Sequence, residues 1–179
     1  DIIMVFFLGF CFPVYYILLR QKHGLRCLGF TKKRIKRSLE INIILALCIC
    51  VFFINITPVL PQFRYSTLCA VIYIFAIGIF ETVFFYGFMR YHIDKAFGLI
   101  PAIVLTAALY SLHHVGFEPE FIKFFLWGLV FTSFFYITRN IFIIFPFSWF
   151  ASAFWDAYFK SQTGLVSMGT TELITGAGL

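Results

Sequence analysis

Glu81 is the first candidate for chemistry in this chain, because it is a carboxylate within the almost wholly apolar stretch from Phe75 to Arg90 (FAIGIFETVFFYGFMR). Placing a charged residue at the centre of a membrane costs at least about 2.5–3.5 kcal/mol, so such a residue faces a cavity or a partner and is by default a functional candidate. We expect Glu81 to act as a general base, or to polarise a water molecule, in a cavity within the membrane. The alternative is a carboxylate paired with a buried partner that serves packing specificity alone.

His113 and His114, in the segment ALYSLHHVGF, are the natural partners of this carboxylate. A Glu–His pair is a minimal device for activating water. Adjacent helical residues point about 100° apart, so we expect one histidine to face the site and the other to face lipid headgroups or a neighbouring helix. His114 is the primary candidate and His113 a secondary one. A histidine at a helix end near headgroups could also be present without any role in a site.

Ser152 and Asp156 lie four residues apart in PFSWFASAFWD and therefore share one helix face. The alternative for Asp156 is an interfacial residue whose carboxylate reaches water. Glu, His and Asp on three helices could also bind a metal, but zinc takes at least three protein ligands and the chain has no His-Glu-x-x-His segment. A divalent metal such as zinc, with Glu81 and His114 as ligands, remains an alternative.

The elements that position these residues are predicted to be membrane-spanning helices. The chain has 179 residues, of which 61% are hydrophobic and 12% charged, and its mean hydropathy is +0.94. This composition is typical of an integral membrane protein and argues against a soluble globular domain. At about 20 residues a span, we predict an all-α fold, a polytopic transmembrane helix bundle of about six spans, forming a single domain over residues 1–179. Because the chain begins with Asp1, we expect it to be a fragment of a longer protein.

The span bounds follow from the apolar runs and from the residues that interrupt them. Pro13 is expected to kink or end the first span, and Pro58 and Pro61 are expected to end the second. The third is predicted to end at Arg90, and a weakly apolar tail follows the sixth. The predicted spans cover residues 1–19, 41–57, 67–90, 99–115, 121–138 and 141–159.

These bounds leave a mismatch between the two halves of the predicted site. Glu81 would lie about 21 Å along the third span, whereas His114 would lie close to the outer end of the fourth. For the two side chains to meet, one helix must tilt, break near Gly78 or Gly87, or begin elsewhere than predicted.

The basic residues predict the orientation of the chain. If spans alternate, eleven of the fourteen Lys and Arg fall on the side of the basic loop at residues 20–38, and three fall on the other side. The positive-inside rule then places this loop in the cytoplasm and the N-terminus outside. The net charge of +6 indicates attraction to anionic lipid, not to nucleic acid. The five cysteines lie mainly inside apolar runs and are expected to pack, not to bind metal.

Three segments, in this order, resemble the CPBP family, the CAAX-protease and bacteriocin-processing membrane proteins. The first motif of that family is Glu-Glu-x-x-x-Arg, often continued as Phe-Arg-Gly. The segment ETVFFYGFMR keeps Glu81, Phe85 and Gly87, and it has Thr82 and Tyr86 at the positions of the second Glu and the Arg. Tyr86 is thereby a secondary site candidate.

The second motif of the family, Phe-x-x-x-His, is matched by Tyr110 to His114, with one aromatic residue exchanged for another. The third motif, His-x-x-x-Asn, falls at Ser152 and Asp156, where both residues differ from the pattern. The resemblance covers about residues 65–160, the predicted core.

This resemblance implies an intramembrane endopeptidase that hydrolyses a membrane-associated peptide. By analogy Glu81 and His114 are the water-activating pair, and Ser152 and Asp156 map to residues that stabilise the oxyanion or complete the site. The implied partners are the lipid bilayer and a membrane-embedded peptide substrate, which could be lipidated or a precursor such as that of a bacteriocin.

Two other functions stay open on the sequence. Thr82, Tyr86 and Ser152 depart from the family motifs and favour a catalytically inactive member that acts as a membrane scaffold or bacteriocin-immunity protein. A transporter would predict paired discontinuous helices in repeated halves, and the sequence has no visible repeat. The 27 Phe and many Ile indicate an AT-rich bacterial genome, so we expect the protein in a bacterial plasma membrane.

Overall fold

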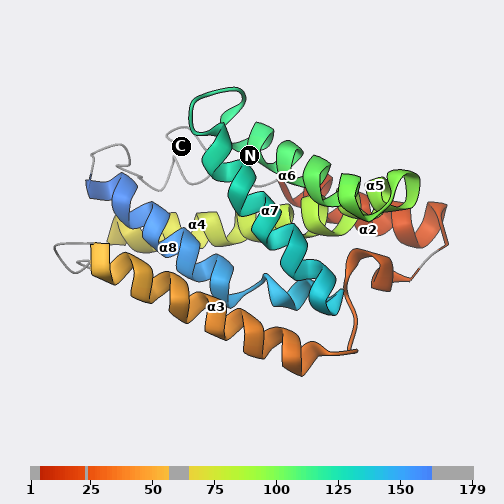
Figure 1. The fold of residues 1–179 in the computed structure, drawn as a ribbon, viewed down its shortest axis with the longest axis horizontal. Coiled ribbons are helices and arrows are strands. Elements are labelled where there is room, and N and C mark those ends of the chain that lie inside the picture. The colour runs from red at the N-terminus through yellow and green to blue at the C-terminus, as the bar shows by residue number, and fades with distance from the viewer. Residues whose placement is uncertain (1–4, 23, 57–64, 163–179) are drawn as a thin grey trace.

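The computed structural model describes residues 5–22, 24–56 and 65–162, and all regular structure in these ranges is helical (Figure 1). This confirms the predicted all-α helix bundle. Three of the elements are π-helices (η1, η2 and η4) and two are short 3-10 helices (η3 and η5). The elements in chain order are η1 (Val5–Cys11), α2 (Phe12–Tyr15), η2 (Tyr16–Arg20), η3 (Leu25–Leu28), α3 (Ile35–Ile56), α4 (Tyr65–Glu81), η4 (Thr82–Met89), α5 (Arg90–Phe97), α6 (Leu99–Val115), α7 (Phe121–Thr138), η5 (Ile141–Ile143) and α8 (Phe147–Gln162).

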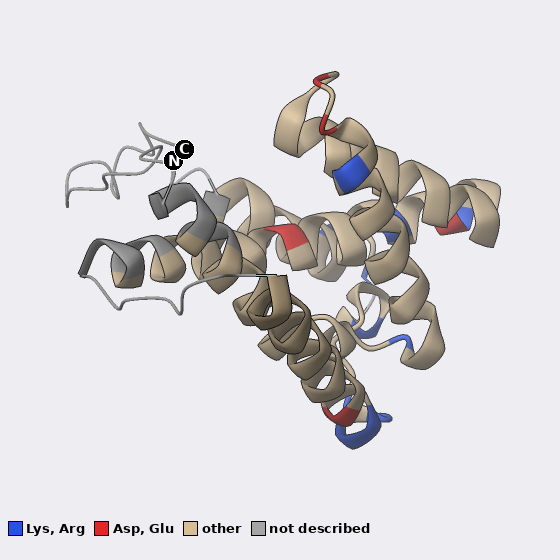
Figure 2. Cartoon of the chain, turned by 60° about the vertical axis from the view of Figure 1, so that its left-hand side comes forward, with Lys and Arg blue, Asp and Glu red and all other residues tan. Residues whose placement is uncertain are grey.

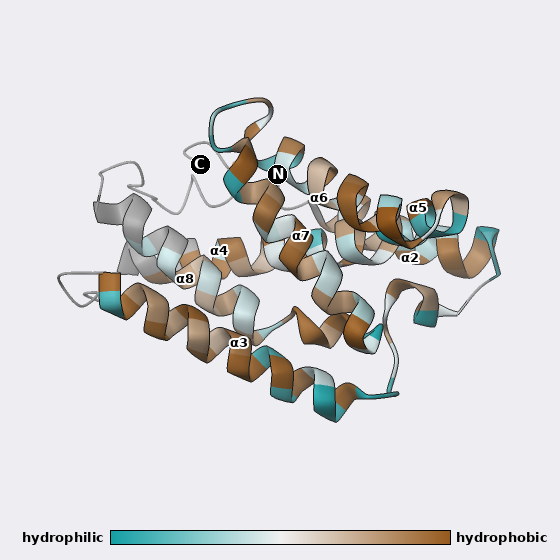
Figure 3. Cartoon of the chain, viewed as in Figure 1, coloured by the Kyte–Doolittle hydropathy of each residue, from teal (hydrophilic) through white to brown (hydrophobic). Residues whose placement is uncertain are grey.

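Three helical stretches in the described residues are long and apolar enough to cross a membrane, namely Ile35–Ile56, Val71–Phe97 and Phe121–Thr138. Shorter apolar helices cover Phe6–Arg20 and Leu99–Val115. Hydrophobic residues run along the bodies of these helices, whereas hydrophilic residues gather at the start of α3 and in the loop between α6 and α7 (Figure 3). The chain is therefore a multi-pass membrane protein.

Several predicted helix bounds hold and others do not. The predicted bounds of α6 and α7 match the structure. The first helix does not end at Pro13 but continues to Arg20, because π-helical turns on both sides of α2 accommodate a residue that has no N–H to donate. The last helix begins at Phe147 and not at 141, since η5 and Pro146 come first. Pro58, Pro61 and the tail lie outside the described residues.

The third span is longer than predicted, and this resolves the mismatch in the sequence-based bounds. Helix continues through Arg90 to Phe97 and ends at Gly98, whose φ of +88° suits a residue without a Cβ. Glu81 lies sixteen residues before Phe97, and His114 lies fifteen residues after Leu99. Because the two arms run antiparallel from one turn, nearly equal lengths bring the carboxylate and the histidine to the same height.

The helices pack mainly as α6 against α7, α3 against α8, and α4 against α8, while α7 runs obliquely across the bundle (Figure 1). Between them lies a core rich in aromatic side chains. Its buried members are Phe85, Tyr86, Tyr110, Phe131, Phe135, Ile143, Ile144 and Trp149. Rings of this size fill the space around α7 and η4 and hold the site residues against one another.

Gly128 lets α6 and α7 approach closely, as small residues do between membrane helices. A Cβ at position 128 would lie 2.8 Å from the Cα of Ala107. We therefore expect Gly128→Ala to lower the free energy of unfolding in detergent by about 1–3 kcal/mol through overpacking. Gly24→Ala is the matched control, because a Cβ there meets nothing within 4 Å. Equal stability of the two variants in a denaturation experiment would contradict the close packing.

Buried amides fasten the segment before α3 to the turn after α7. Asn140 is fully buried and donates to the carbonyl oxygens of Thr31 (2.8 Å) and Lys33 (3.1 Å), while its own oxygen accepts from the Phe142 amide. Asn42 donates to the Phe142 carbonyl and accepts from the Ser148 amide, so α3, η5 and α8 are joined at one point. These bonds give Asn42 a role in the contact between helices.

Asn140→Asp should separate the donor and acceptor roles of this amide. The carboxylate could still accept from Phe142, but the two carbonyl oxygens of Thr31 and Lys33 would lose their donor. Leaving buried groups unsatisfied costs about 1–3 kcal/mol, so we expect a loss of that size in the free energy of unfolding. Asn55→Asp is the control, since Asn55 is exposed near the end of α3 and its one described hydrogen bond stays within that helix, to Val51. A smaller effect at 140 than at 55 would contradict this assignment.

Charged residues occupy the helix ends and loops of the described chain, with few inside the bundle (Figure 2). The acidic loop between α6 and α7 lies apart from the start of α3, where Lys and Arg gather (Figure 2). This separation is compatible with the predicted orientation, which stays a prediction.

Candidate active site

The centre of the candidate site is an ion-pair contact between Glu81 and His114. The Oε1 atom of Glu81 lies 3.2 Å from the Nε2 atom of His114. The Glu81 side chain is 4% exposed and that of His114 is 21% exposed. The carboxylate is thus almost completely withdrawn from solvent and has an imidazole as its partner.

The backbone determines which nitrogen of His114 carries hydrogen when the ring is neutral. Its Nδ1 atom lies 2.9 Å from the carbonyl oxygen of Tyr110, one turn earlier in α6. Because a carbonyl oxygen can only accept, Nδ1 is the donor, and Nε2 presents a lone pair toward Glu81. Two acceptors at 3.2 Å are held together when one proton lies between them. The pair is therefore built to hold a single proton.

His113 also faces Glu81, which the sequence did not predict. Its Nε2 atom lies 3.9 Å from the same Glu81 oxygen, and its side chain is 42% exposed. The rings of His113 and His114 stand at 90° to each other with centroids 5.5 Å apart. The expectation that only one of the two could face the site was wrong, because two long side chains can converge on one atom although their Cα–Cβ bonds diverge.

Tyr86, the secondary candidate, lies in the aromatic core that packs against this pair. It is fully buried in η4, and its ring packs against Tyr110 and Trp149 at centroid distances of 5.6 and 6.2 Å. The Tyr110 ring lies 4.2 Å from the His114 ring. Tyr86 thus supports the residue that supports His114. The π-helical winding of η4 begins directly after Glu81, and such π segments are frequent at functional sites.

Arg90 stabilises the backbone of η4. Its side chain donates to the carbonyl oxygens of Tyr86 (2.7 Å) and Cys27 (2.9 Å), and its guanidinium lies 4.1 Å from the ring centroid of Phe135. Backbone hydrogen bonds in a π-helix run between residues five apart, not four, and the five N–H groups of an arginine can serve several carbonyl oxygens at once. The sequence analysis missed this residue, although an arginine inside an apolar run was a visible signal.

The structure describes no contact between the Glu81–His114 pair and the last two predicted residues, Ser152 and Asp156. Ser152 is half-buried on α8, while Asp156 lies on the same helix and its side chain is outside the description. The α8 residue that reaches the supporting rings is Trp149. Its ring is tilted against that of Phe131, with the centroids 5.3 Å apart, and it lies so close to Gly78 that a Cβ there would clash with the indole nitrogen.

The described residues do not fit a zinc site. Glu81, His113 and His114 lie together, but both histidine nitrogens approach the same carboxylate oxygen, at 3.9 and 3.2 Å. No group of three or more His, Cys, Asp or Glu side chains in residues 5–22, 24–56 and 65–162 is arranged to hold a metal ion. A structural or catalytic zinc needs at least three protein ligands. We therefore derive no step through a metal.

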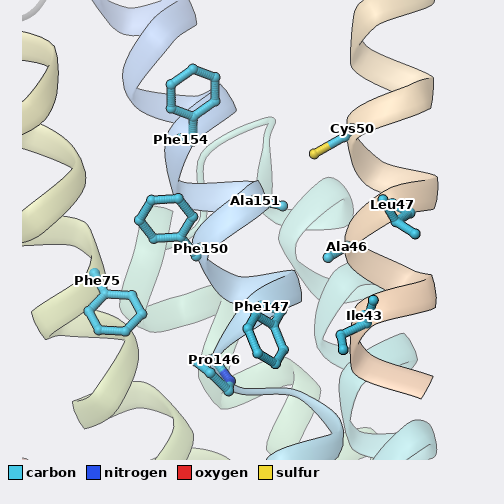
Figure 4. Close-up of a pocket in the computed structure, with 10 residues that line it drawn as sticks. All are labelled: Ile43, Ala46, Leu47, Cys50, Phe75, Pro146, Phe147, Phe150, Ala151 and Phe154. Carbon is cyan, nitrogen blue, oxygen red and sulfur yellow. The ribbon is translucent and has the colours of Figure 1, made fainter. Parts of the chain in front are cut away.

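A separate apolar groove of about 610 Å³ lies between α3, α4 and α8 (Figure 4). Phe147, Phe150 and Phe154 line it from α8, at the spacing of one helix face, and Trp149 points from the opposite face. Neither Glu81 nor a histidine lines this groove, so it suits hydrocarbon and offers no acid–base chemistry.

The chain is thus a multi-pass helical membrane protein with a buried carboxylate beside a histidine, two groups that can accept or donate protons. The family model for Type II CAAX prenyl endopeptidase Rce1-like proteins matches residues 63–158, and the chain belongs to this family. The matched segment contains all six site candidates of the sequence analysis. No curated protein and no solved structure matches the chain. Membership in this family indicates intramembrane protease activity.

Proposed function

We propose that this protein is an intramembrane endopeptidase that hydrolyses a membrane-associated peptide with a water activated by Glu81 and His114. The observation that carries the proposal is the 3.2 Å contact between a 4% exposed carboxylate and an imidazole whose Nε2 lone pair faces it. General bases must lie within hydrogen-bond reach of the proton that they abstract. A water molecule beside Oε1 and Nε2 would meet this condition for both.

The reaction is a general-base hydrolysis. The form of the pair that reacts is the one without the shared proton, a carboxylate beside a neutral imidazole. The water oxygen forms a bond with the scissile carbonyl carbon, the carbonyl π electrons move to oxygen, and one water proton passes to the Glu81–His114 pair, which then shares it. When the tetrahedral intermediate collapses, the C–N bond breaks, the carbonyl re-forms, and the pair returns its proton to the leaving nitrogen. The Tyr110 carbonyl keeps the His114 ring oriented throughout.

The substrate of the proposed reaction is a peptide held at the membrane, either lipidated or an unmodified precursor. The family description names a prenyl endopeptidase, which favours a peptide that carries an isoprenoid chain. The competing function is a non-catalytic scaffold or immunity protein. It is supported by Thr82, which is buried beside Glu81 where the family motif has a second carboxylate, and by Ser152, which contacts neither member of the pair among the described interactions.

The test is cleavage by the purified chain, reconstituted in lipid, of matched peptides with and without a C-terminal prenyl group. We expect turnover of at least one of them, detected by mass spectrometry of both fragments. Preference for the prenylated peptide would assign the substrate class. The positive control is a relative with all three complete motifs that cuts the same peptides. If the folded protein then cleaves neither peptide, the scaffold or immunity function is favoured.

A further inference from the structure

The proposed reaction places a negative charge on the carbonyl oxygen, and the site must offer a donor to it. Preorganised N–H or O–H groups aimed at this oxygen are commonly the largest single contribution to catalysis of acyl transfer. The residue expected for this task from the sequence, Ser152, has no described contact with Glu81 or His114. The donor must therefore be sought among the groups that surround the pair.

The other polar groups near the pair are buried, including the hydroxyls of Thr82 and Tyr86, which have no hydrogen-bond partner among the described residues. Arg90 lies nine residues beyond Glu81, and its guanidinium donates to the carbonyl oxygens of Tyr86 and Cys27. Tyr86 and Tyr110 are buried under the pair, as parts of the aromatic core. Trp149 packs on the Gly78 side of that core. None of them borders the side from which a peptide could reach the carboxylate.

His113 does border that side. Exposure of the side chains rises from 4% at Glu81 to 21% at His114 and 42% at His113, so a substrate reaches the buried carboxylate past His113. Its Nε2 atom, 3.9 Å from Glu81 Oε1, is too far for a direct hydrogen bond and close enough for a reacting group to contact both. Rings of Phe80 and Phe85, at 5.4 and 5.2 Å, hold the imidazole in place.

We infer that His113 is a catalytic residue of the proposed peptidase, whose Nε2–H donates a hydrogen bond to the oxyanion of the tetrahedral intermediate. The inference rests on the proposed function. Glu81 and His114 handle the water proton, and His113 transfers none: it strengthens one hydrogen bond as the C=O π electrons move to oxygen and releases it when the carbonyl re-forms. Thus His113 stabilises the oxyanion, and His114 together with Glu81 transfers the proton.

The test compares His113→Leu, which removes the donor, with His113→Gln, which keeps an N–H near the same place. We expect His113→Leu to lower kcat by about 10²-fold with little change in KM, because loss of one oxyanion donor acts on the transition state. His113→Gln should recover much of that loss. Binding of a membrane-anchored peptidyl phosphonate, whose tetrahedral anion resembles the intermediate, should weaken in His113→Leu by a similar factor.

The control is His92→Leu, because His92 is a half-buried histidine that contacts Gln21 and the Phe88 carbonyl and has no described contact with Glu81 or His114. It should leave both kcat and phosphonate binding unchanged. A cleaving parent protein whose His113→Leu variant is equally fast would overturn this inference alone. So would a His113→Gln variant as slow as His113→Leu, or unchanged phosphonate binding. A parent protein that cleaves nothing would overturn the proposed function and this inference with it.

Discussion

Replacing Glu81 by Gln is expected to lower kcat for peptide cleavage by about 10²–10⁴-fold, the usual contribution of a general base. The amide is nearly isosteric with the carboxylate and can donate to the His114 Nε2 lone pair at the same 3.2 Å, so the bundle should stay folded. It cannot accept the proton of a water molecule. The measurement is steady-state kinetics in lipid vesicles, with thermal unfolding in detergent to verify the fold.

His114→Ala provides the companion to this variant. Because the two side chains hold one proton between them, we expect the double variant Glu81→Gln/His114→Ala to be little slower than either single variant, as is found for residues that act as a unit. Losses that multiply would show that the two groups act separately. Full activity in Glu81→Gln would exclude this carboxylate as the base.

Replacing Arg90 by Met should have the largest effect on stability among single changes outside the pair. Met keeps much of the side-chain length but supplies no donors, so the carbonyl oxygens of Tyr86 and Cys27 lose charged partners. Each hydrogen bond of that kind contributes about 1.5–3 kcal/mol, so we expect the free energy of unfolding to fall by about 3 kcal/mol. Turnover should fall too, since η4 begins directly after Glu81.

Arg26→Met is the matched control for this prediction, because Arg26 is an exposed arginine of the same η3 segment that Arg90 contacts. It should change neither stability nor kinetics. Arg90→Lys tests the geometry: a single ammonium cannot span both carbonyl oxygens and the Phe135 face as the planar guanidinium does. Full stability in Arg90→Lys would mean that charge alone matters at this position.

Composition and the motif at Glu81 were sufficient to predict the helix bundle and the Glu81–His114 pair. Both signals are strong, since long apolar runs have few other folds and a carboxylate inside one is costly. The meeting of the two residues could not be predicted with the span ending at Arg90. An arginine usually marks the membrane boundary, but here Arg90 pairs with Asp94 at 3.6 Å and donates to backbone carbonyl oxygens inside the protein, so the helix runs on to Phe97.

Other parts of the site depended on details that helical periodicity does not carry. The rotamer of His113 brings its ring toward Glu81. A helical wheel cannot show this, because it gives only the directions of the Cα–Cβ bonds. On α8, Trp149 and Ser152 lie three residues apart and share one helix face, but the long indole reaches the Tyr86 ring whereas Ser152 has no described contact with it. The position of α8 also depends on the hydrogen bond from the Ser148 amide to Asn42, a contact between residues more than one hundred positions apart.

The hairpin that closes at Gly98 has a consequence for how this family can vary. Glu81 and His114 are 33 positions apart, and they meet because the arms on either side of the turn have nearly equal lengths. One residue inserted in either arm would move its functional group by about 1.5 Å and rotate it by about 100°, whereas residues added at the turn itself would leave both arms in place. Alignments of active relatives should therefore be free of gaps between the first motif and the turn, and between the turn and the second motif. Length changes should collect at the position of Gly98, so that the pattern of gaps alone distinguishes members that keep the pair from those that have lost it.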